Sequence, residues 1–234
     1  MRRPAPRTRR PGPGPTPPRL PVARPLERLR SVSIEDDASY TDGEIAERRF
    51  AGAAARRLTL ARVVLRDVDL TAARLDKLTL SDVRLTNCDL ANAVWRESTL
   101  DRVELIGCRV TGLDLTEASA TSLVLRDCVG SLASFRFAAL KRARFEDCGL
   151  TEVDFLNAEL TEVIFRRCDL KSAVFHGARA SGADLRGCTL DDLRIGPGDL
   201  AGAVIDPIQL VALARRMAAN QGIVVRSLDD DGVA

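Results

Sequence analysis

Large apolar side chains recur at every fifth residue through the middle of the chain. From Phe50 to Ile205, the 32 positions whose number is a multiple of five hold eighteen Leu, six Phe, two Ile, one Val and one Trp; the other four hold Ala or Gly. Apolar residues recur every three or four positions in an amphipathic helix and every second position in a strand, so neither element explains a period of five. A short fixed period predicts a solenoid.

A second column, of mostly small residues, lies two positions before each large one. Positions 48 to 203 in steps of five hold twelve Ala, six Val, six Cys and five Leu, with Arg48, Ser98 and Gly198 as the exceptions. Burying an unpaired charge is costly, and Arg48, beside the start of the repeat, is the only charge in either column. Both columns are therefore expected to face the interior.

The cysteines indicate how many pentads make one turn. All six lie in the second column, and each is 20 residues from the next: Cys88, Cys108, Cys128, Cys148, Cys168 and Cys188. Four pentads then complete one four-sided coil, and the 32 pentads predict about eight coils stacked at about 4.8 Å. Residues 50–205 are assigned to this domain.

Different elements are expected at the two ends. Asp206 and Pro207 form a helix start, and Leu210, Leu213 and Met217 follow on one face. With Gly222 as C-cap, this predicts a helix of about 14 residues and a short apolar run within 206–225, which caps the open end or also forms a homodimer. Residues 31–49, including Ile34 and Tyr40, are expected to cover the other end.

The first 30 residues differ in composition from everything that follows. Nine of the eleven prolines lie in residues 1–25, and residues 1–30 hold nine Arg against the single Glu27. Such a segment buries too little apolar surface to order itself, so residues 1–30 are expected to form a disordered tail with polyproline II stretches. Residues 226–234 are expected to form an acidic tail.

Three stretches of the repeat carry a family resemblance: CDLANA at 88–93, ADLRGC at 183–188 and LAGA at 200–203. They are similar to the A(D/N)LXX pattern of the pentapeptide repeat family, over about residues 46–205. The resemblance implies an all-β fold, a right-handed quadrilateral parallel β-helix with a C-terminal capping α-helix. It also points to actinobacterial members with a dimerising terminal helix and, more distantly, to the fluoroquinolone-resistance branch, whose acidic rods bind DNA gyrase.

The chain shows little equipment for catalysis. The cysteines lack the paired Cys-x-x-Cys spacing of zinc sites, so reduced, buried thiols are expected. His176, the only histidine, follows a central Phe and is expected to face solvent. Phosphate-loop and nucleophile-elbow motifs are both missing. We expect no enzyme activity, no cofactor, and no catalytic, cofactor-binding or metal-binding residue.

Charge placement bears on the choice of partner. Residues 46–205 hold 23 basic and 23 acidic side chains, and only the side that carries the cysteines has a net charge near −3. DNA mimicry needs a continuous negative stripe, and this pattern does not supply one. We expect a cytoplasmic scaffold, without a membrane segment, that binds a macromolecular partner, with protein the favoured class. The alternative is a DNA gyrase-binding protector, and the third is a nucleic-acid tether through residues 1–30.

Overall fold

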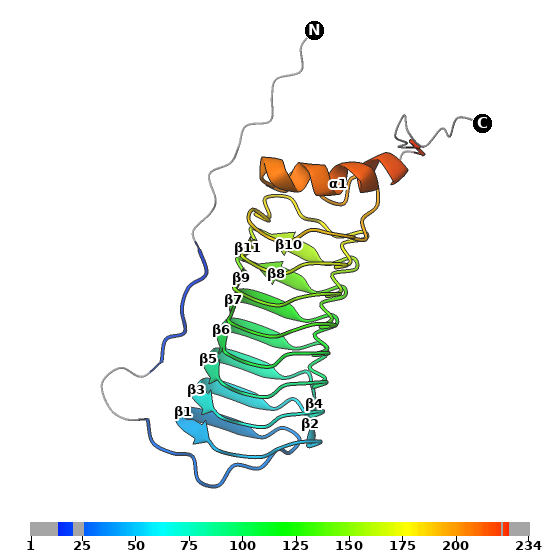
Figure 1. The fold of residues 1–234 in the computed structure, drawn as a ribbon. Helices are drawn as coiled ribbons and strands as arrows, with labels where there is room; N and C mark the ends of the chain where they lie inside the picture. The colour runs from blue at the N-terminus through cyan, green and yellow to red at the C-terminus, as the bar shows by residue number, and fades with distance from the viewer. Residues whose placement is uncertain (1–13, 21–25, 221, 225–234) are drawn as a thin grey trace, which may run out of the picture.

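The chain winds into a parallel β-solenoid closed at one end by a helix (Figure 1). The computed structural model describes residues 14–20, 26–220 and 222–224. The expected tails 1–30 and 226–234 fall largely or entirely outside these residues. Within the described residues, no helix has the length and apolar character needed to cross a membrane.

Two kinds of strand build the coils. Long strands span two neighbouring sides: β1 (Ser39–Ala46), β3 (Thr59–Arg66), β5 (Thr79–Thr86), β6 (Thr99–Ile106) and β7 (Ser119–Arg126). Short strands lie on one side only: β2 (Ala54–Arg56), β4 (Arg74–Asp76), β8 (Ala139–Lys141), β9 (Arg144–Glu146), β10 (Glu159–Thr161) and β11 (Ile164–Arg166). The main sheet runs β1-β3-β5-β6-β7-β8-β10, β7 also pairs with β9 and β9 with β11, and β2 pairs with β4.

Every pairing in these sheets joins a residue to the one 20 positions later. Leu60 pairs with Leu80, Leu80 with Leu100, and Phe145 with Phe165, all in parallel register. The sides without regular strands follow the same rule through isolated bridges, such as Asp69 with Asp89. The prediction of four pentads per coil is therefore confirmed.

The number of fully stacked turns is smaller than predicted. On the side that carries the cysteines, Arg49 and Thr189 end the ladder, and six rungs from Asp69 to Asp169 have bridge partners both above and below. The structure thus has about six fully stacked turns, whereas the period predicted about eight coils. The difference arises because the terminal pentads have a neighbouring coil on one side only.

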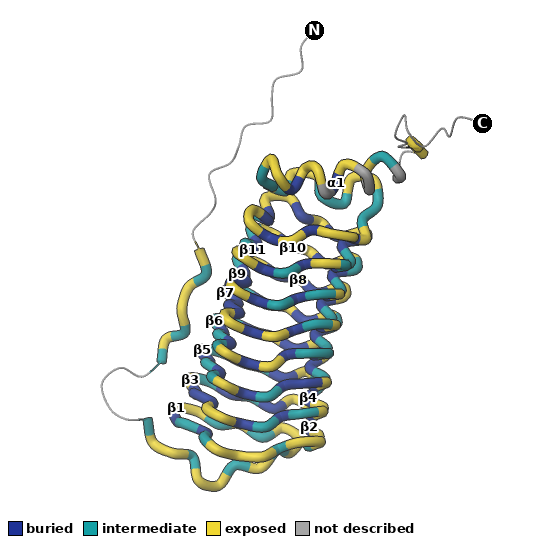
Figure 2. The backbone as a smooth tube through the Cα atoms, in the orientation of Figure 1, coloured by how far each residue is buried: buried dark blue, intermediate teal, exposed yellow. Residues whose placement is uncertain are grey.

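The interior consists of the two predicted columns (Figure 2). All six cysteines are free and buried, as predicted, and the thiol of Cys128 donates to the carbonyl oxygens of Arg126 and Leu105 at 3.3 and 3.5 Å. Phenylalanine rings stack between adjacent coils, with centroids 4.8 Å apart for Phe145 and Phe165. The core is therefore filled by the repeat's own side chains.

Removing one thiol from this column should cost little stability. Cys128→Ala deletes a single small group from a column that holds Ala at many other positions, so we expect a loss of about 1 kcal/mol in the free energy of unfolding. Urea denaturation of the purified variant measures this value. A loss comparable to that of a large-to-small core substitution would show that the thiol column stabilises the fold through more than packing.

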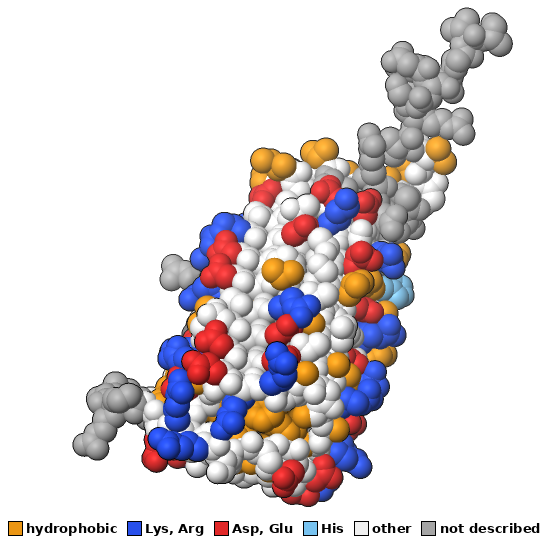
Figure 3. All heavy atoms as spheres, turned by 60° about the horizontal axis from the view of Figure 1, so that its bottom comes forward, with side chains coloured by type: hydrophobic (Ala, Val, Ile, Leu, Met, Phe, Trp, Pro, Cys, Tyr) orange, Lys and Arg blue, Asp and Glu red, His pale blue; other side chains and the backbone are white. Residues whose placement is uncertain are grey.

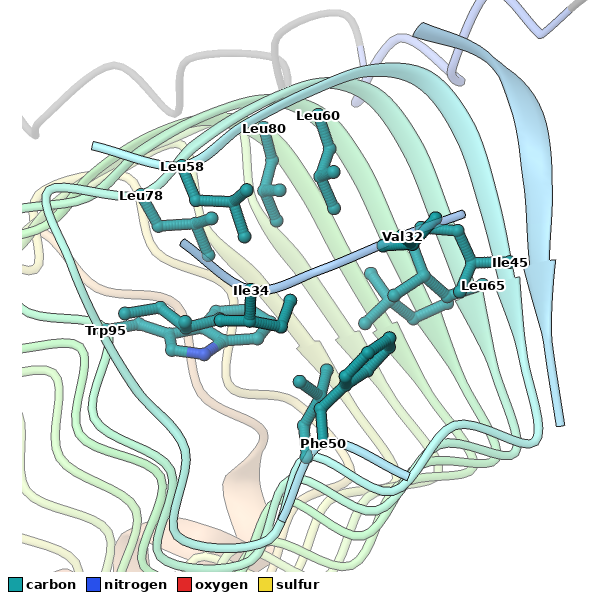
Figure 4. A pocket seen from close by; sticks show the side chains of 13 residues that line it. Val32, Ile34, Ile45, Phe50, Leu58, Leu60, Leu65, Leu78, Leu80 and Trp95 are labelled. Carbon is teal, nitrogen blue, oxygen red and sulfur yellow. The ribbon is translucent and has the colours of Figure 1, made fainter. Parts of the chain in front are cut away.

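At the N-terminal end, an extended segment crosses the first coil. Val32 and Ile34 lie against the core, and with Phe50 and Trp95 they line an apolar cavity of about 20 Å³ (Figure 4). Pairing with the solenoid already starts at Arg28, which forms a parallel bridge with Glu44, whereas the N-terminal cap was expected to start at residue 31.

Helix α1 (Pro207–Asn220) covers the C-terminal end, as the sequence predicts. The Asp206 carboxylate accepts from the N–H of Gln209 at 3.0 Å, and the Gln209 side chain accepts from the N–H of Asp206 at 2.8 Å, a reciprocal capping box. The Gln209 amide also donates to the carbonyl oxygens of Leu185 and Cys188, both at 2.7 Å. This one side chain starts the helix and satisfies open carbonyl groups near the end of the solenoid.

Candidate binding surfaces

Each pentad presents three outward positions, which together form the four sides and the corners. In the pentad centred on Phe135, Ser134 and Arg136 point outward and Phe137 occupies the corner. Corner residues have positive φ, and most are Asp, Asn, Gly or charged residues. Leu132 and Phe137 are exceptions, since bulky side chains rarely occupy this backbone region.

Ion pairs between adjacent coils neutralise much of the surface charge. Most of them join residues 20 apart, as follows: Asp37–Arg57, Asp42–Arg62, Arg49–Asp69, Lys77–Glu97, Asp82–Arg102, Arg84–Glu104, Asp89–Arg109, Arg126–Glu146, Asp147–Arg167 and Glu159–Arg179. Figure 3 accordingly shows basic and acidic side chains interspersed over the visible surface. Most of these pairs are solvent-exposed, so each contributes little to stability.

The pair formed by Asp82 and Arg102 differs from the others in its burial. Asp82 is 7% exposed, and its carboxylate accepts two hydrogen bonds from the Arg102 guanidinium at 2.6 and 2.8 Å. It also accepts from the backbone N–H of Arg19 at 2.7 Å. These hydrogen bonds, led by those from Arg102, lower the pKa of the Asp82 carboxyl to about 2.

Replacing this carboxylate should therefore have a pH-dependent effect. The Asp82 pKa is lower in the folded chain than in the unfolded chain, so its contribution is complete above about pH 4 and is lost as the pH falls toward 2. One pKa unit corresponds to about 1.4 kcal/mol, so Asp82→Asn should cost on the order of 2 kcal/mol at neutral pH.

Urea denaturation at several pH values measures this effect. In Asp147→Asn, which alters a more exposed pair with Arg167, the loss should be smaller. Equal losses for Asp82→Asn at pH 2 and pH 7 would contradict the assignment of the effect to ionised Asp82.

Exposed apolar side chains gather at mid-height of the solenoid. Val129, Leu132 and Phe137, which we call the Leu132 patch, are each about half exposed or more and belong to two consecutive pentads. Beside them the outward Ser131 and Thr151 hydroxyl oxygens lie 2.7 Å apart. Arg136 points outward between Leu132 and Phe137, so the Leu132 patch combines exposed apolar side chains with a basic neighbour, a composition that suits a protein partner.

A second apolar surface covers the C-terminal end. We call it the helix surface, and its exposed members are Ile208, Leu210, Val211 and Met217. Of the three apolar residues predicted on one helix face, only Leu213 is buried, while Leu210 and Met217 are about half exposed. Both line a cavity of about 340 Å³ between α1 and the last coil.

The six thiols lie inside the described solenoid, whereas the imidazole of His176 lies on its surface. The contact of Cys108 with the neighbouring thiols, together with its burial, raises the pKa of that thiol, which favours its protonated form. The His176 side chain is 67% exposed, as predicted, and its Nδ1 lies 3.6 Å from the Asp199 carboxylate. In the described part of the chain, no three His, Cys, Asp or Glu side chains gather so that they could hold a metal ion.

Two surface features escaped the sequence analysis. The ion pairs between coils could have been found from opposite charges spaced by 20, as in Asp82 and Arg102. The second is the contact between Arg19 and Asp82, which attaches part of the expected tail to the solenoid. In the sequence, the three-residue spacing of Pro15, Pro18 and Pro21 could have indicated an extended segment with one proline face.

Comparison with known proteins adds a family likeness. A family model described as a pentapeptide repeat region matches residues 78–154, 98–175 and 127–195, which together cover half of the chain. A trypsin-treated form of QnrB1, described as a plasmid-mediated fluoroquinolone resistance protein, is 18% identical, with 80% of this chain and 99% of that chain covered and a TM-score of 0.42.

A second solved structure is HetL from the cyanobacterium Nostoc sp. strain PCC 7120, described as a pentapeptide repeat protein involved in heterocyst differentiation regulation. It is 23% identical, with 73% of this chain and 90% of that chain covered and a TM-score of 0.27. No curated protein sequence matches the chain.

Proposed function

Because the chain belongs to the pentapeptide repeat family, we propose that it is a non-catalytic scaffold that presents a rigid, flat-sided surface to a macromolecular partner, with protein as the favoured class. The observation that carries this proposal is the filled interior. The residues of both inward columns are almost fully buried from Leu58 to Leu193. Recognition must therefore use the outer sides and the two ends.

The regular outer rows support the same proposal. Backbone hydrogen bonds hold each outward side chain at a fixed position relative to the coil above and the coil below. A surface organised in this way loses little conformational entropy when a partner binds. We place this activity in the cytoplasm, because six reduced thiols are typical of a reducing compartment.

Affinity capture with a matched pair of surface variants tests this function. The purified chain, immobilised and exposed to extract of the native organism, should retain a partner in stoichiometric amounts. Leu132→Asp combined with Phe137→Asp should abolish retention, because it places two charges on the Leu132 patch. Thr79→Asp, on another side of the solenoid, should retain the partner. If all three proteins retain nothing above a bare-matrix control, the scaffold proposal is wrong.

DNA gyrase binding of the resistance type is the alternative. An acidic rod that replaces DNA needs a continuous negative surface, whereas many carboxylates here pair with Arg or Lys of the adjacent coil, as Asp89 does with Arg109. This pairing favours a protein-binding scaffold over a DNA mimic. A gyrase supercoiling assay separates the two, and inhibition or protection at stoichiometric protein would favour the alternative.

A nucleic-acid tether through residues 1–30 is the third candidate. Nine Arg side chains in this segment could neutralise phosphates, with binding that weakens steeply as salt rises. Deletion of residues 1–30 should then abolish salt-sensitive DNA binding. Binding that survives the deletion would place the contact elsewhere.

A homodimer through the helix surface is an additional proposal. Ile208 and Val211 are 85% and 74% exposed, and a two-fold contact would cover both, together with the mouth of the neighbouring cavity. We expect the full chain to elute as a dimer, and Ile208→Asp with Val211→Asp to convert it to a monomer. Light scattering coupled to size-exclusion chromatography measures both masses.

The control for this variant is Val129→Asp, which adds a charge to an exposed apolar position at mid-height of the solenoid. It should leave the dimer intact. A monomeric full chain at high protein concentration would rule out the helix surface as a dimer interface.

A further inference from the structure

A short segment of the chain lies along one corner of the solenoid. Residues 14–20 run beside the stacked strands in Figure 1, from the level of β5 toward that of β9. At one end, the N–H of Arg19 donates to Asp82 at 2.7 Å. At the other, a Cβ placed on Gly14 would lie 3.0 Å from an Nη atom of Arg144. We call the surface between Asp82 and Arg144 the Asp82 corner.

The two half-buried prolines of this segment lie three residues apart. Pro15, Pro18 and Leu20 are half-buried, whereas Thr16, Pro17 and Arg19 are exposed. A polyproline II helix has three residues per turn, so positions 15 and 18 lie on one face of it. Four residues of this sequence, 15–18, read P-T-P-P, which satisfies the P-x-x-P spacing that aromatic-lined grooves recognise in other folds.

The length of residues 14–20 also matches the height of the Asp82 corner. Three coils separate Asp82 from the coil of Arg144, about 14 Å at a stacking distance of about 4.8 Å. Five residues separate Arg19 from Gly14, about 15 Å at the polyproline II rise of about 3.1 Å. One polyproline turn of about 9.3 Å therefore spans two coils, about 9.6 Å. An extended proline segment stays in register with this corner over several turns, which an α-helix with a 5.4 Å pitch would not do.

Two outward residues between the contact points are concealed from solvent. Ser122 and Val124 occupy outward positions of the repeat, yet they are only 1% and 6% exposed. Residues 14–20 pass between their contacts with Asp82 and Arg144, and we attribute the burial of Ser122, in the same corner as Asp82, to this segment. Among the described residues, the Ser122 hydroxyl has no hydrogen-bond partner. It is available to donate to a backbone carbonyl, and a proline-rich segment presents such carbonyls without competing N–H groups.

We propose that the Asp82 corner is a recognition surface for proline-rich segments in the polyproline II conformation. The partner is a segment of another protein with prolines three residues apart, followed by a residue whose free N–H reaches Asp82. Residues 14–20 are a built-in copy of this ligand and occupy the corner until it is displaced. The inference rests on the proposed scaffold function and names the class of partner for one surface.

Occupation of the Asp82 corner by residues 14–20 should lower the apparent affinity of the full chain for an external peptide. A tethered segment competes at an effective concentration in the millimolar range, so it masks the corner from a weaker external peptide. Pro15→Gly combined with Pro18→Gly removes the polyproline preference of the tethered segment without altering any residue of the solenoid. We call this protein the released variant.

The test is a titration of a fluorescein-labelled peptide with the sequence of residues 14–20, followed by fluorescence anisotropy. The full chain and the released variant are compared at the same salt concentration. We expect the released variant to bind the peptide at least ten-fold more tightly than the full chain. No binding to the released variant, or equal binding to both proteins, overturns the proposal.

Two peptide variants then test the hydrogen bond without disturbing the protein. A peptide with Arg19→Pro lacks the N–H that Asp82 accepts but keeps the extended conformation, so it should bind at least ten-fold more weakly to the released variant. A peptide with Arg19→Ala keeps the N–H and should bind within about three-fold of the original, because the Arg19 side chain is exposed. Similar affinity for both peptides contradicts this contact.

A matched pair of substitutions locates the site on the solenoid. In the released variant, Asp82→Asn should weaken peptide binding, whereas Asp42→Asn, in the same corner two coils away, should not. Equal effects of the two substitutions overturn the assignment of the site. If proline-dependent dimers form between full chains and disappear in the released variant, the occupant is a second copy and the proposal is wrong. If the peptide does not bind, this inference fails but the scaffold function does not, because affinity capture tests that function separately.

Discussion

Leu125→Asp should severely destabilise the solenoid. Leu125 lies near the C-terminal end of β7, is 1% exposed, and pairs in register with Leu105 and Phe145 of the adjacent coils. A carboxylate at this position would be buried without a partner, so we expect a loss of more than about 4 kcal/mol. Since whole domains have stabilities of only about 5 to 15 kcal/mol, this loss removes a large share of the stability and should lower the melting temperature strongly.

Circular dichroism melting curves measure this effect, and Leu132→Asp is the matched control. Leu132 is 59% exposed, and its φ of 61° lies in the region that Asp adopts more easily than Leu. The control should therefore melt within a few degrees of the parent protein. Equal melting temperatures for the two variants would show that residue 125 does not face the interior.

Phe155→Ala should produce the second large loss. The Phe155 ring is fully buried and lies between a stacked Phe135 ring and a tilted Phe175 ring, with centroids 5.2 and 5.1 Å away. Two further rings, Phe145 and Phe165, approach it edge-on. Truncation leaves a cavity bounded by backbone that is held on all four sides, so the coil collapses little, and we expect a loss of about 4 kcal/mol.

The corresponding control removes a ring from the surface. Phe137→Ala, at a corner where the side chain is 49% exposed, should change stability by no more than about 0.5 kcal/mol. Urea denaturation of both variants provides the comparison. A loss for Phe137→Ala as large as that for Phe155→Ala would mean that the Leu132 patch is covered by other parts of the chain.

Sequence reasoning worked where the repeat imposes the same condition on every coil. The 20-residue spacing of Cys88 and Cys108 predicts the four-sided coil, because side chains can form a stacked column only when the turn length equals their spacing. The helix start at Asp206 and Pro207 was also predictable, since capping depends on neighbouring residues alone. The number of fully stacked turns was overestimated because periodicity does not show which pentads have neighbours on both sides.

The candidate surfaces were less predictable than the fold. Exposure of Val129, Leu132 and Phe137 follows from their outward places in two consecutive pentads, but that pattern does not distinguish them as a binding surface. Burial of Asp82 was not predictable either, because it depends on Arg102 in the adjacent coil and on Arg19, which lies 63 residues earlier in the chain. The proposed partner class comes from this long-range contact.

The amino-acid pattern alone determined the period, the inward columns, the position of the capping helix and the scarcity of catalytic groups. Each of these features depends on residues that are close in the chain or repeat at a constant interval, so the sequence pattern is sufficient to predict it. Tertiary structure decided which coil ends are covered, which charges are paired and where the proline segment lies. Those features result from contacts between distant segments, whose energies depend on distance and burial that local sequence does not encode.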